Sequence, residues 1–243
     1  MGGASLRRRR PTMTTGLQIF SDRRLKRDRL YIGMVASGVI FDCDGVLVDT
    51  EVIANRALAS LMTELGIPTT TEESIARYMG RSWTSVMSIL TEELGASPPE
   101  DLLRRYREAV EDAWRSELLP VPGIVEALDR IALPYCVASS GDHDRIRLTL
   151  GITGLLSRFE GRIFSASDVA NGKPEPDLFL HAAKEMGFDP SRTTVVEDTV
   201  PGIQAGKAAG MRVLAYARLV KADLLAEAGG EVFSEMAELP SLL

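Results

Sequence analysis

The sequence predicts an α/β protein: a Rossmann-like parallel sheet with helices on both faces, plus an inserted all-helical domain. Short apolar runs alternate with helical stretches from residue 35 onward, a pattern typical of parallel strands joined by helices. Residues 52–118 interrupt this alternation, because they contain several helical patterns and no strand pattern. We therefore expect a core formed by residues 34–50 and 120–243, and a helical domain formed by residues 51–119.

Five short apolar runs are the predicted strands. The first, residues 38–41, ends abruptly at Asp42, and the others are residues 134–138, 162–164, 193–196 and 212–215. Helices are expected between them at about 123–131, 142–150, 177–186 and 201–209. Within the inserted domain, helices are expected at about 52–65, 72–78, 83–94 and 99–115, separated by Gly and Pro residues.

Composition narrows the class of protein. The chain has 243 residues, of which 45% are hydrophobic and 26% charged, which excludes a wholly disordered protein. No run approaches the roughly 18 uncharged apolar residues of a membrane span, so no membrane partner is expected. The net charge of −6 argues against a nucleic-acid partner. Two widely separated cysteines, Cys43 and Cys136, fit a reducing cytoplasm. The oligomeric state stays open.

Residues 1–33 differ from the rest of the chain in charge. They contain nine basic and two acidic residues, a net charge of +7, so the remaining chain carries −13. Three explanations stay open for this segment: an extension from a start codon upstream of Met34, a disordered polybasic arm, or an organelle transit peptide. We treat it as a disordered basic leader outside the predicted fold.

Polar side chains follow the predicted strands at the edge where open parallel sheets bind ligands. They are Asp42 and Asp44 after the first strand, Ser139 and Ser140 after the second, Lys173 ahead of a helix, and Glu197 and Asp198 after the fourth strand. Each has a structural explanation when taken singly, as a turn, a helix cap or a solvated charge. Their occurrence together, in order, favours a functional site.

The residue types in this set indicate phosphoryl transfer. Crowded carboxylates need a cation to stay ionised, and oxygen-rich sites favour Mg²⁺. A hydroxyl, a lysine and the N–H groups of a helix N-terminus suit a phosphate group. A metal, a phosphate site and a spare carboxylate together predict a reaction through an aspartyl-phosphate.

These residues resemble the motifs of the haloacid dehalogenase superfamily. Residues 41–50, FDCDGVLVDT, are similar to its motif I, Ser139 to motif II, Lys173 to motif III, and Glu197 with Asp198 to motif IV. The resemblance covers about residues 34–217. The inserted helices resemble the C1 cap domain of the subgroup that contains β-phosphoglucomutase and the sugar-phosphate or phosphoglycolate phosphatases.

The resemblance implies a role for each acid. Asp42 is implied to be the nucleophile and a Mg²⁺ ligand. Asp44 is implied to be the general acid and base, with its backbone carbonyl on the metal. Asp198 is implied to be a metal ligand, and Glu197 either a ligand or the partner of one. The i, i+2 spacing predicts that Asp42 and Asp44 face the same way if the chain stays extended.

The phosphate-binding residues are likewise implied by the resemblance. They are Gly45, Ser139, Ser140 and Lys173. In the cap, Arg81 lies where relatives place a loop that faces the substrate, and it is a candidate for contacting a carboxylate or phosphate. We expect Trp83 in the core of the cap, and Tyr106 on a solvated helix face.

Missing residues narrow the reaction further. Asp44, Glu197 and Asp198 are not needed by a dehalogenase, and a phosphonate-cleaving relative uses a cap lysine that residues 51–119 do not contain. A mutase of the β-phosphoglucomutase type has a cap histidine at the position of Ala54. We therefore expect a Mg²⁺-dependent phosphatase of a small phosphorylated metabolite, a sugar or sugar-acid phosphate. A phosphosugar mutase is the alternative; a non-catalytic binding protein would be expected to lose Asp42 or Asp198.

Overall fold

The computed structural model describes residues 1–2, 36–79, 81 and 83–243. The chain divides into two units, Met1–Val35 and Ala36–Leu243, and the description below concerns the second. The predicted basic leader, apart from its first two residues, lies outside the described residues.

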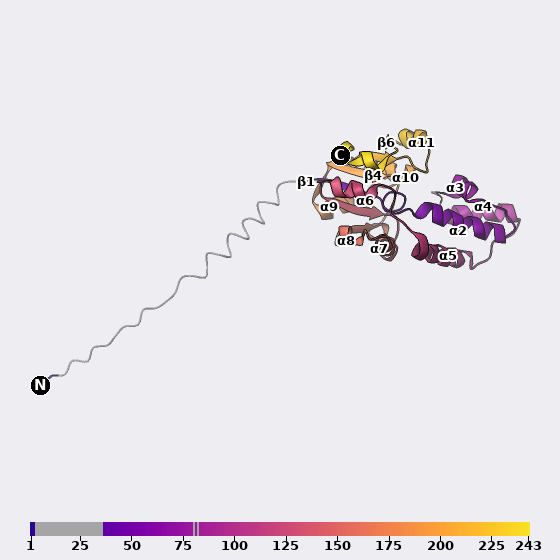
Figure 1. Ribbon diagram of the computed structural model, residues 1–243, viewed down its shortest axis with the longest axis horizontal. Helices are drawn as coiled ribbons and strands as arrows, with labels where there is room; N and C mark the ends of the chain where they lie inside the picture. Colours follow the sequence, from indigo (N-terminus) through magenta and orange to yellow (C-terminus); the bar gives the residue numbers. More distant parts are fainter. Residues whose placement is uncertain (3–35, 80, 82) are drawn as a thin grey trace. The chain divides into compact units, whose positions relative to one another are not determined.

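A six-stranded parallel sheet forms the centre of this unit, with the strand order β3-β2-β1-β4-β5-β6 (Figure 1). The strands are β1 (Ala36–Phe41), β2 (Tyr135–Ser139), β3 (Ile163–Ser165), β4 (Phe188–Glu197), β5 (Arg212–Tyr216) and β6 (Glu231–Phe233). From β1 the chain builds outward through β2 and β3, and then returns to the other side of β1 to place β4. Ligands bind open sheets at such a reversal of strand order, beyond the carboxyl ends of the strands.

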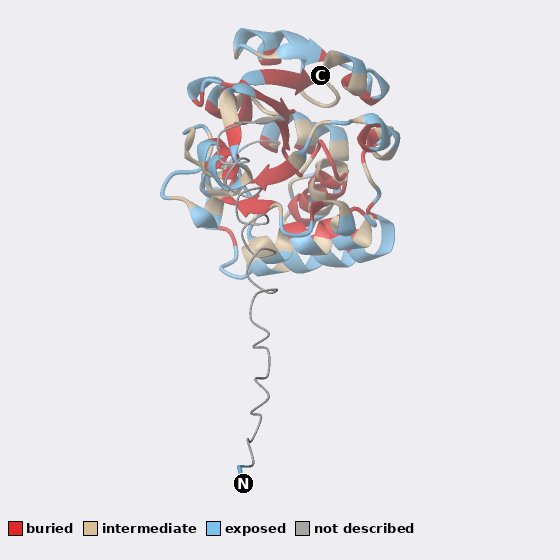
Figure 2. Cartoon of the chain, turned by 90° about the vertical axis from the view of Figure 1, so that its left-hand side faces the viewer, coloured by how far each residue is buried: buried red, intermediate tan, exposed pale blue. Residues whose placement is uncertain are grey.

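Helices cover both faces of the sheet because successive strand residues point to opposite faces. Phe41 packs with α6 (Ile124–Arg130), α7 (His143–Ile152), α8 (Leu156–Phe159) and α12 (Leu239–Leu242). Ile40 packs on the other face with α9 (Asp177–Met186), α10 (Val200–Ala208) and α11 (Ala222–Glu227). Figure 2 shows the strands buried between helices whose outer faces are exposed. The predicted fold class is confirmed.

Four helices lie between β1 and α6, and we call them the cap helices. They are α2 (Thr50–Glu64), α3 (Thr71–Tyr78), α4 (Trp83–Leu94) and α5 (Leu102–Glu117). They lie together beside the sheet (Figure 1), around their own buried cluster that includes Leu58, Met62 and Leu90. Thr70 begins α3 with a capping box, in which it exchanges hydrogen bonds with Glu73. The segment is helical because its apolar residues recur at helical spacing.

The two connections between the cap helices and the sheet run side by side. Val48 and Pro120 form a bridge, and the Asp49 N–H donates to the Leu119 carbonyl at 3.0 Å. Arg218, which follows β5, donates to both carboxylate oxygens of Asp49 at 2.7 and 2.6 Å. This bidentate pair fixes the start of α2 against the core.

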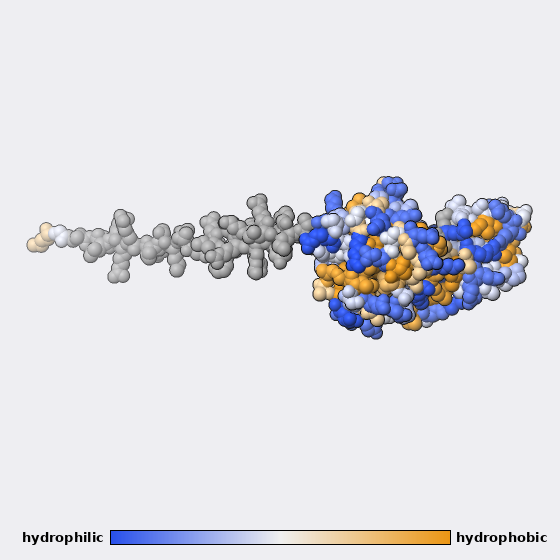
Figure 3. Space-filling view, turned by 90° about the horizontal axis from the view of Figure 1, so that it is seen from above, coloured by the Kyte–Doolittle hydropathy of each residue, from blue (hydrophilic) through white to orange (hydrophobic). Residues whose placement is uncertain are grey.

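Several short elements escaped the sequence analysis. The strand β6 and the helices α8, α11 and α12 are three to six residues long, too short for a periodic pattern. Strand β4 begins at Phe188, earlier than expected, because Phe188 pairs with Ala36 across an irregular register. Hydrophobic and hydrophilic residues are interspersed on the face shown in Figure 3. Over the described part of the chain, no helix combines the length and the apolar character needed to cross a membrane.

Candidate active site

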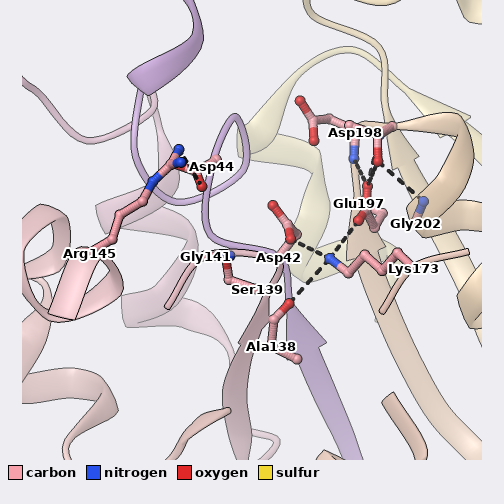
Figure 4. Close-up of polar contacts among 11 residues, drawn as sticks. Asp42, Asp44, Ala138, Ser139, Gly141, Arg145, Lys173, Glu197, Asp198 and Gly202 are labelled. Atoms are coloured by element: carbon pink, nitrogen blue, oxygen red, sulfur yellow. Dashed lines mark hydrogen bonds and ion pairs between the residues drawn. The ribbon is translucent and has the colours of Figure 1, made fainter. Parts of the chain in front are cut away.

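A buried lysine connects the predicted nucleophile to motif IV. Lys173 Nζ donates to Asp42 Oδ1, to Glu197 Oε1 at 2.8 Å and to the Ala138 carbonyl at 3.3 Å (Figure 4). Asp42 lies directly beyond β1, where its N–H donates to the Val196 carbonyl of β4 at 2.9 Å. Burial alone would lower the pKa of Lys173, but Asp42 and Glu197 together raise it, so the side chain stays an ammonium. The parallel register thus brings together residues that are 131 and 24 positions apart.

Glu197 is almost fully hydrogen-bonded within the protein. Its Oε1 accepts from Lys173, while its Oε2 accepts from the N–H groups of Asp198 and Thr199 and from Thr199 Oγ1, all at 2.8 Å. A Cβ on Gly202 would lie 1.7 Å from Glu197 Oε1, so only glycine lets α10 approach this carboxylate. Of the two roles expected for Glu197, this geometry favours that of a positioning residue for Lys173 over that of a direct ligand.

Asp198 is the buried acid without a full set of partners. Its Oδ1 is buried and has no hydrogen-bond partner. Burial raises the pKa of Asp198, and the carboxylates of Glu197 and Asp42 raise it further. Burial also raises the pKa of Asp42, with Lys173 acting in the opposite direction. Three buried carboxylates therefore face one buried ammonium, and the site lacks positive charge.

This deficit and the donor types fit a divalent cation. Among the described residues, no group of three or more His, Cys, Asp and Glu side chains forms a metal cage. Mg²⁺ does not need one, since it usually binds one or two carboxylates and keeps several waters. The unpaired Oδ1 of Asp198 and the carboxylate of Asp42 could supply those two ligands.

Gly45 brings the loop after β1 against Asp198. It has a φ of +80°, and a Cβ there would lie 2.1 Å from Asp198 Oδ2. Its N–H donates to the Val48 carbonyl at 2.8 Å. The Gly45 N–H is therefore used in a turn, and the expected role of Gly45 in binding phosphate stays a prediction.

The expectation that Asp42 and Asp44 face the same way is wrong. Thr50 Oγ1 donates to Asp44 Oδ1 at 2.7 Å, and Arg145 Nη2 lies 3.0 Å from Asp44 Oδ2. Figure 4 shows Asp44 facing Arg145, away from Asp42. The reason is that the strand ends at residue 41 and the chain turns through Gly45, so the alternation of an extended strand does not apply.

The two serines of motif II differ in exposure. Ser139 is buried at the end of β2, and its Oγ accepts from the Gly141 N–H at 3.1 Å, which leaves its hydroxyl proton free to donate. Ser140 is exposed and faces the cleft. Both line this cleft together with Asp42 and Lys173, and their role in binding phosphate stays a prediction.

The cleft holds about 1160 Å³ and lies between these residues and the cap helices. Ala54 lines it, at the position where a mutase has a histidine. Trp83 and Tyr106 also line it and stack with ring centroids 5.2 Å apart, so Tyr106 does not lie on a solvated face as expected. Arg81 lies at the exposed rim, where its Nε donates to the Arg77 carbonyl at 2.6 Å. Its role as a specificity residue stays a prediction.

Comparison with known proteins identifies the family. The family model of haloacid dehalogenase-like hydrolases matches residues 39–216. The chain belongs to this family. Its 6-phosphogluconate phosphatase member from Escherichia coli is 33% identical over 205 residues, which cover 84% of this chain and 93% of that protein. The predicted family and the predicted class, a phosphoric monoester hydrolase, are confirmed.

Solved structures of haloacid dehalogenase-like proteins have the same fold. A member of unknown function from Agrobacterium tumefaciens is 36% identical and gives a TM-score of 0.79 over 86% of this chain and 97% of that one. A putative β-phosphoglucomutase from Thermotoga maritima is 28% identical, with a TM-score of 0.72 over 85% and 97% of the two chains.

Three residues of the site were missed by the sequence analysis. Arg145 pairs with Asp44, and its Cζ lies 5.0 Å from the ring centroid of Trp114 on α5. Glu51, at the start of α2, lines the same cleft; burial raises its pKa to about 7, and the charge of Asp44 adds to the effect. Glu51 follows motif I and Arg145 follows motif II in the sequence, which was the available signal, whereas Trp114 on α5 is next to neither motif. Without that signal, an arginine or glutamate on a helix is expected to be a solvent-exposed charge.

Proposed function

We propose that this haloacid dehalogenase-like hydrolase is a Mg²⁺-dependent phosphatase of small phosphorylated sugars or sugar acids. One observation carries the proposal. Lys173 holds one oxygen of Asp42 and leaves the other free, beside a buried carboxylate oxygen of Asp198 that has no partner. A nucleophile with one oxygen held and the other free, next to a buried carboxylate that could bind a cation, suits a reaction through an aspartyl-phosphate.

Asp42, Asp198 and the backbone carbonyl of Asp44 are the residues proposed to hold Mg²⁺. When bound, the ion offsets the negative charge of the carboxylates and of the incoming phosphate. Lys173 and Ser139 contribute an ammonium and a hydroxyl to the phosphoryl oxygens. Glu197 keeps Lys173 in place by accepting from it at 2.8 Å.

The reaction has two displacements at phosphorus. In the first, Asp42 Oδ2 forms a bond to phosphorus, the bond to the leaving oxygen breaks, and Asp44, which must enter this step as the carboxylic acid, gives its proton to that oxygen and becomes a carboxylate. In the second, Asp44 takes a proton from a water molecule whose oxygen attacks phosphorus, and the bond to Asp42 breaks to release phosphate. Asp44 must first turn from Arg145 toward the leaving oxygen, because both its oxygens are engaged elsewhere.

The substrate class and the location are supported by different observations. The relative from Escherichia coli is named for 6-phosphogluconate, a sugar-acid phosphate. The cleft of about 1160 Å³ is large enough for such a molecule. A cytoplasmic location is supported by Cys43 and Cys136, which are both free thiols.

The proposal is tested by phosphate release from a panel of phosphorylated sugars, sugar alcohols and sugar acids, including β-glucose 1-phosphate. Each compound is assayed with Mg²⁺ and with excess chelator, and glucose 6-phosphate is measured in the same run. We expect metal-dependent release of phosphate from one or a few compounds. Release that survives the chelator would contradict the metal site. Glucose 6-phosphate formed without free phosphate would show a mutase instead.

A further inference from the structure

Three residues that line the cleft have a buried hydrogen-bond donor without a partner. Four buried side-chain polar atoms of the described residues have no partner: Tyr78 Oη, Trp114 Nε1, Arg145 Nε and Asp198 Oδ1. Three of these residues, all except Asp198, line the cleft. Leaving a buried donor unpaired costs about 1–3 kcal/mol, so three in one cavity require an explanation. They indicate a ligand that brings acceptor oxygens to the cap side of the cleft.

Arg145 is the charged member of this group and the one nearest the chemistry. It lies on α7, whose first turn is held by Asp142 accepting from the Arg145 N–H at 2.8 Å. Its guanidinium spans from Asp44 Oδ2, at 3.0 Å, to the Trp114 ring, at 5.0 Å. A guanidinium offers five donors in one plane, a geometry that suits two oxygens of a carboxylate. Its Nε donor is still unused.

The other charges of the cleft make Arg145 the cation available to a distal anion. The lining contains seven acidic and five basic residues, so a ligand anion is not held by overall charge. Lys173 is committed to Asp42 and Glu197. The remaining basic residues, Arg81, Arg107 and Arg115, are exposed. Exposed charges contribute little binding energy.

Catalysis itself removes the present partner of Arg145. When Asp44 turns toward the leaving oxygen, the guanidinium loses its carboxylate in a partly buried position. A carboxylate on the substrate can take that place, so the ion pair is exchanged and not broken. A neutral hydroxyl would replace it only in part.

We propose that Arg145 selects substrates whose leaving group has a carboxylate, so that phosphorylated sugar acids are preferred over phosphorylated sugar alcohols. The substrate carboxylate replaces Asp44 on Arg145 and thereby frees Asp44 for proton transfer. Trp114 Nε1 and Tyr78 Oη donate to the hydroxyls between the two ends of the substrate. This inference rests on the proposed phosphatase function.

The test measures kcat/KM for two substrates that differ at one carbon, 6-phosphogluconate and glucitol 6-phosphate. Both are assayed with the native protein and with the Arg145→Gln variant of the whole chain. We expect the native enzyme to prefer the acid by about 10-fold or more in kcat/KM. Arg145→Gln should lower kcat/KM for the acid by roughly 10- to 100-fold, the range for losing a charge-assisted hydrogen bond. The loss for glucitol 6-phosphate should be smaller, so the ratio of kcat/KM for the acid to kcat/KM for the alcohol should fall by about 10-fold or more.

The matched control is Arg147→Gln, on the same helix, which removes an exposed arginine that lies 3.1 Å from Glu160. Arg147→Gln should leave kcat/KM unchanged for both substrates. p-Nitrophenyl phosphate serves as a third substrate, since its leaving group needs no protonation; its hydrolysis by Arg145→Gln shows that the variant is folded. Arg145→Lys should restore part of the preference, because it keeps the charge and loses the planar fork.

Two results would overturn the inference while leaving the phosphatase in place. One is a native enzyme that hydrolyses both substrates equally or prefers glucitol 6-phosphate. The other is an equal loss of both activities in Arg145→Gln, which would mean that Arg145 only positions Asp44. If none of the three phosphate esters is hydrolysed with Mg²⁺ present, the proposed function fails as well.

Discussion

The two sides of the cleft satisfy their polar groups in opposite ways. On the sheet side, the Lys173 ammonium contacts two carboxylates and a carbonyl, and Glu197 accepts hydrogen bonds from four donors. On the cap side, Trp114 and Tyr78 are buried with donors that have no partner. Apart from Asp198, the polar groups of the sheet side have their hydrogen-bond partners without a ligand, whereas Trp114 and Tyr78 on the cap side do not.

This difference separates chemistry from selection. A network with all its partners in place holds the reacting carboxylate in one position before the substrate arrives. Unpaired donors stabilise nothing until a ligand supplies acceptors, and a ligand without these acceptors binds poorly. Changes on the sheet side should therefore alter turnover and stability, and changes on the cap side should alter substrate preference.

The largest effect is expected for Asp42→Asn. An amide is a far weaker nucleophile than a carboxylate, so kcat should fall by at least about 10⁴-fold, as when other enzymes lose a covalent nucleophile. Lys173 keeps Glu197 as its partner, so the fold should persist. Phosphate release and circular dichroism measure the two effects. Substantial turnover in a folded Asp42→Asn protein would refute the nucleophile assignment.

Gly202→Ala should disturb the sheet side without replacing any of its polar side chains. The added methyl would lie 1.7 Å from Glu197 Oε1, so the carboxylate must move and Lys173 must lose its support. We expect a loss of about 1–3 kcal/mol in the free energy of unfolding and a clear fall in kcat. Gln204→Ala, an exposed change on the same helix, is the control. Unchanged kcat would show that Glu197 does not position Lys173.

Trp114→Phe, on the cap side, should weaken substrate binding without lowering stability. The ring under Arg145 is kept, but the unpaired Nε1 donor is removed. Stability should stay level or rise, since an unsatisfied buried donor is lost, while KM rises about 3- to 10-fold because one hydrogen bond to the substrate disappears. Urea unfolding and steady-state kinetics give the two values. A fall in the free energy of unfolding with an unchanged KM would show that the Trp114 donor stabilises the cap helices and does not bind the substrate.

The smallest effect is expected for Arg104→Ala, because Arg104 is not among the residues that line the cleft. Arg104 pairs with Asp101 and Glu108 on the exposed face of α5. Solvent screens such pairs, so neither the urea concentration at the unfolding midpoint nor kcat/KM should change measurably. A measurable loss of kcat/KM would mean that this face of α5 contributes to substrate binding.

The sequence by itself determined the sheet side of the site. Asp42, Lys173 and Glu197 could be placed together because parallel strands end at one edge, whatever the details of their packing. The same holds for the buried strands and the longer helices, whose apolar residues recur with a fixed period. The helix 177–186 was predicted with the bounds that the structure has.

Only the tertiary structure decided which way Asp44 faces and what covers it. The turn after Asp42 breaks the alternation of the strand, so spacing gave the wrong direction. Arg145 and Trp114 come from different helices, and neither has a sequence signal that links it to Asp44. Contacts between distant segments depend on how helices pack against one another. The reacting groups can be placed from the sequence because parallel strands end at one edge of the sheet. The proposed recognition of the leaving group depends on side chains that only the packing of the helices brings together.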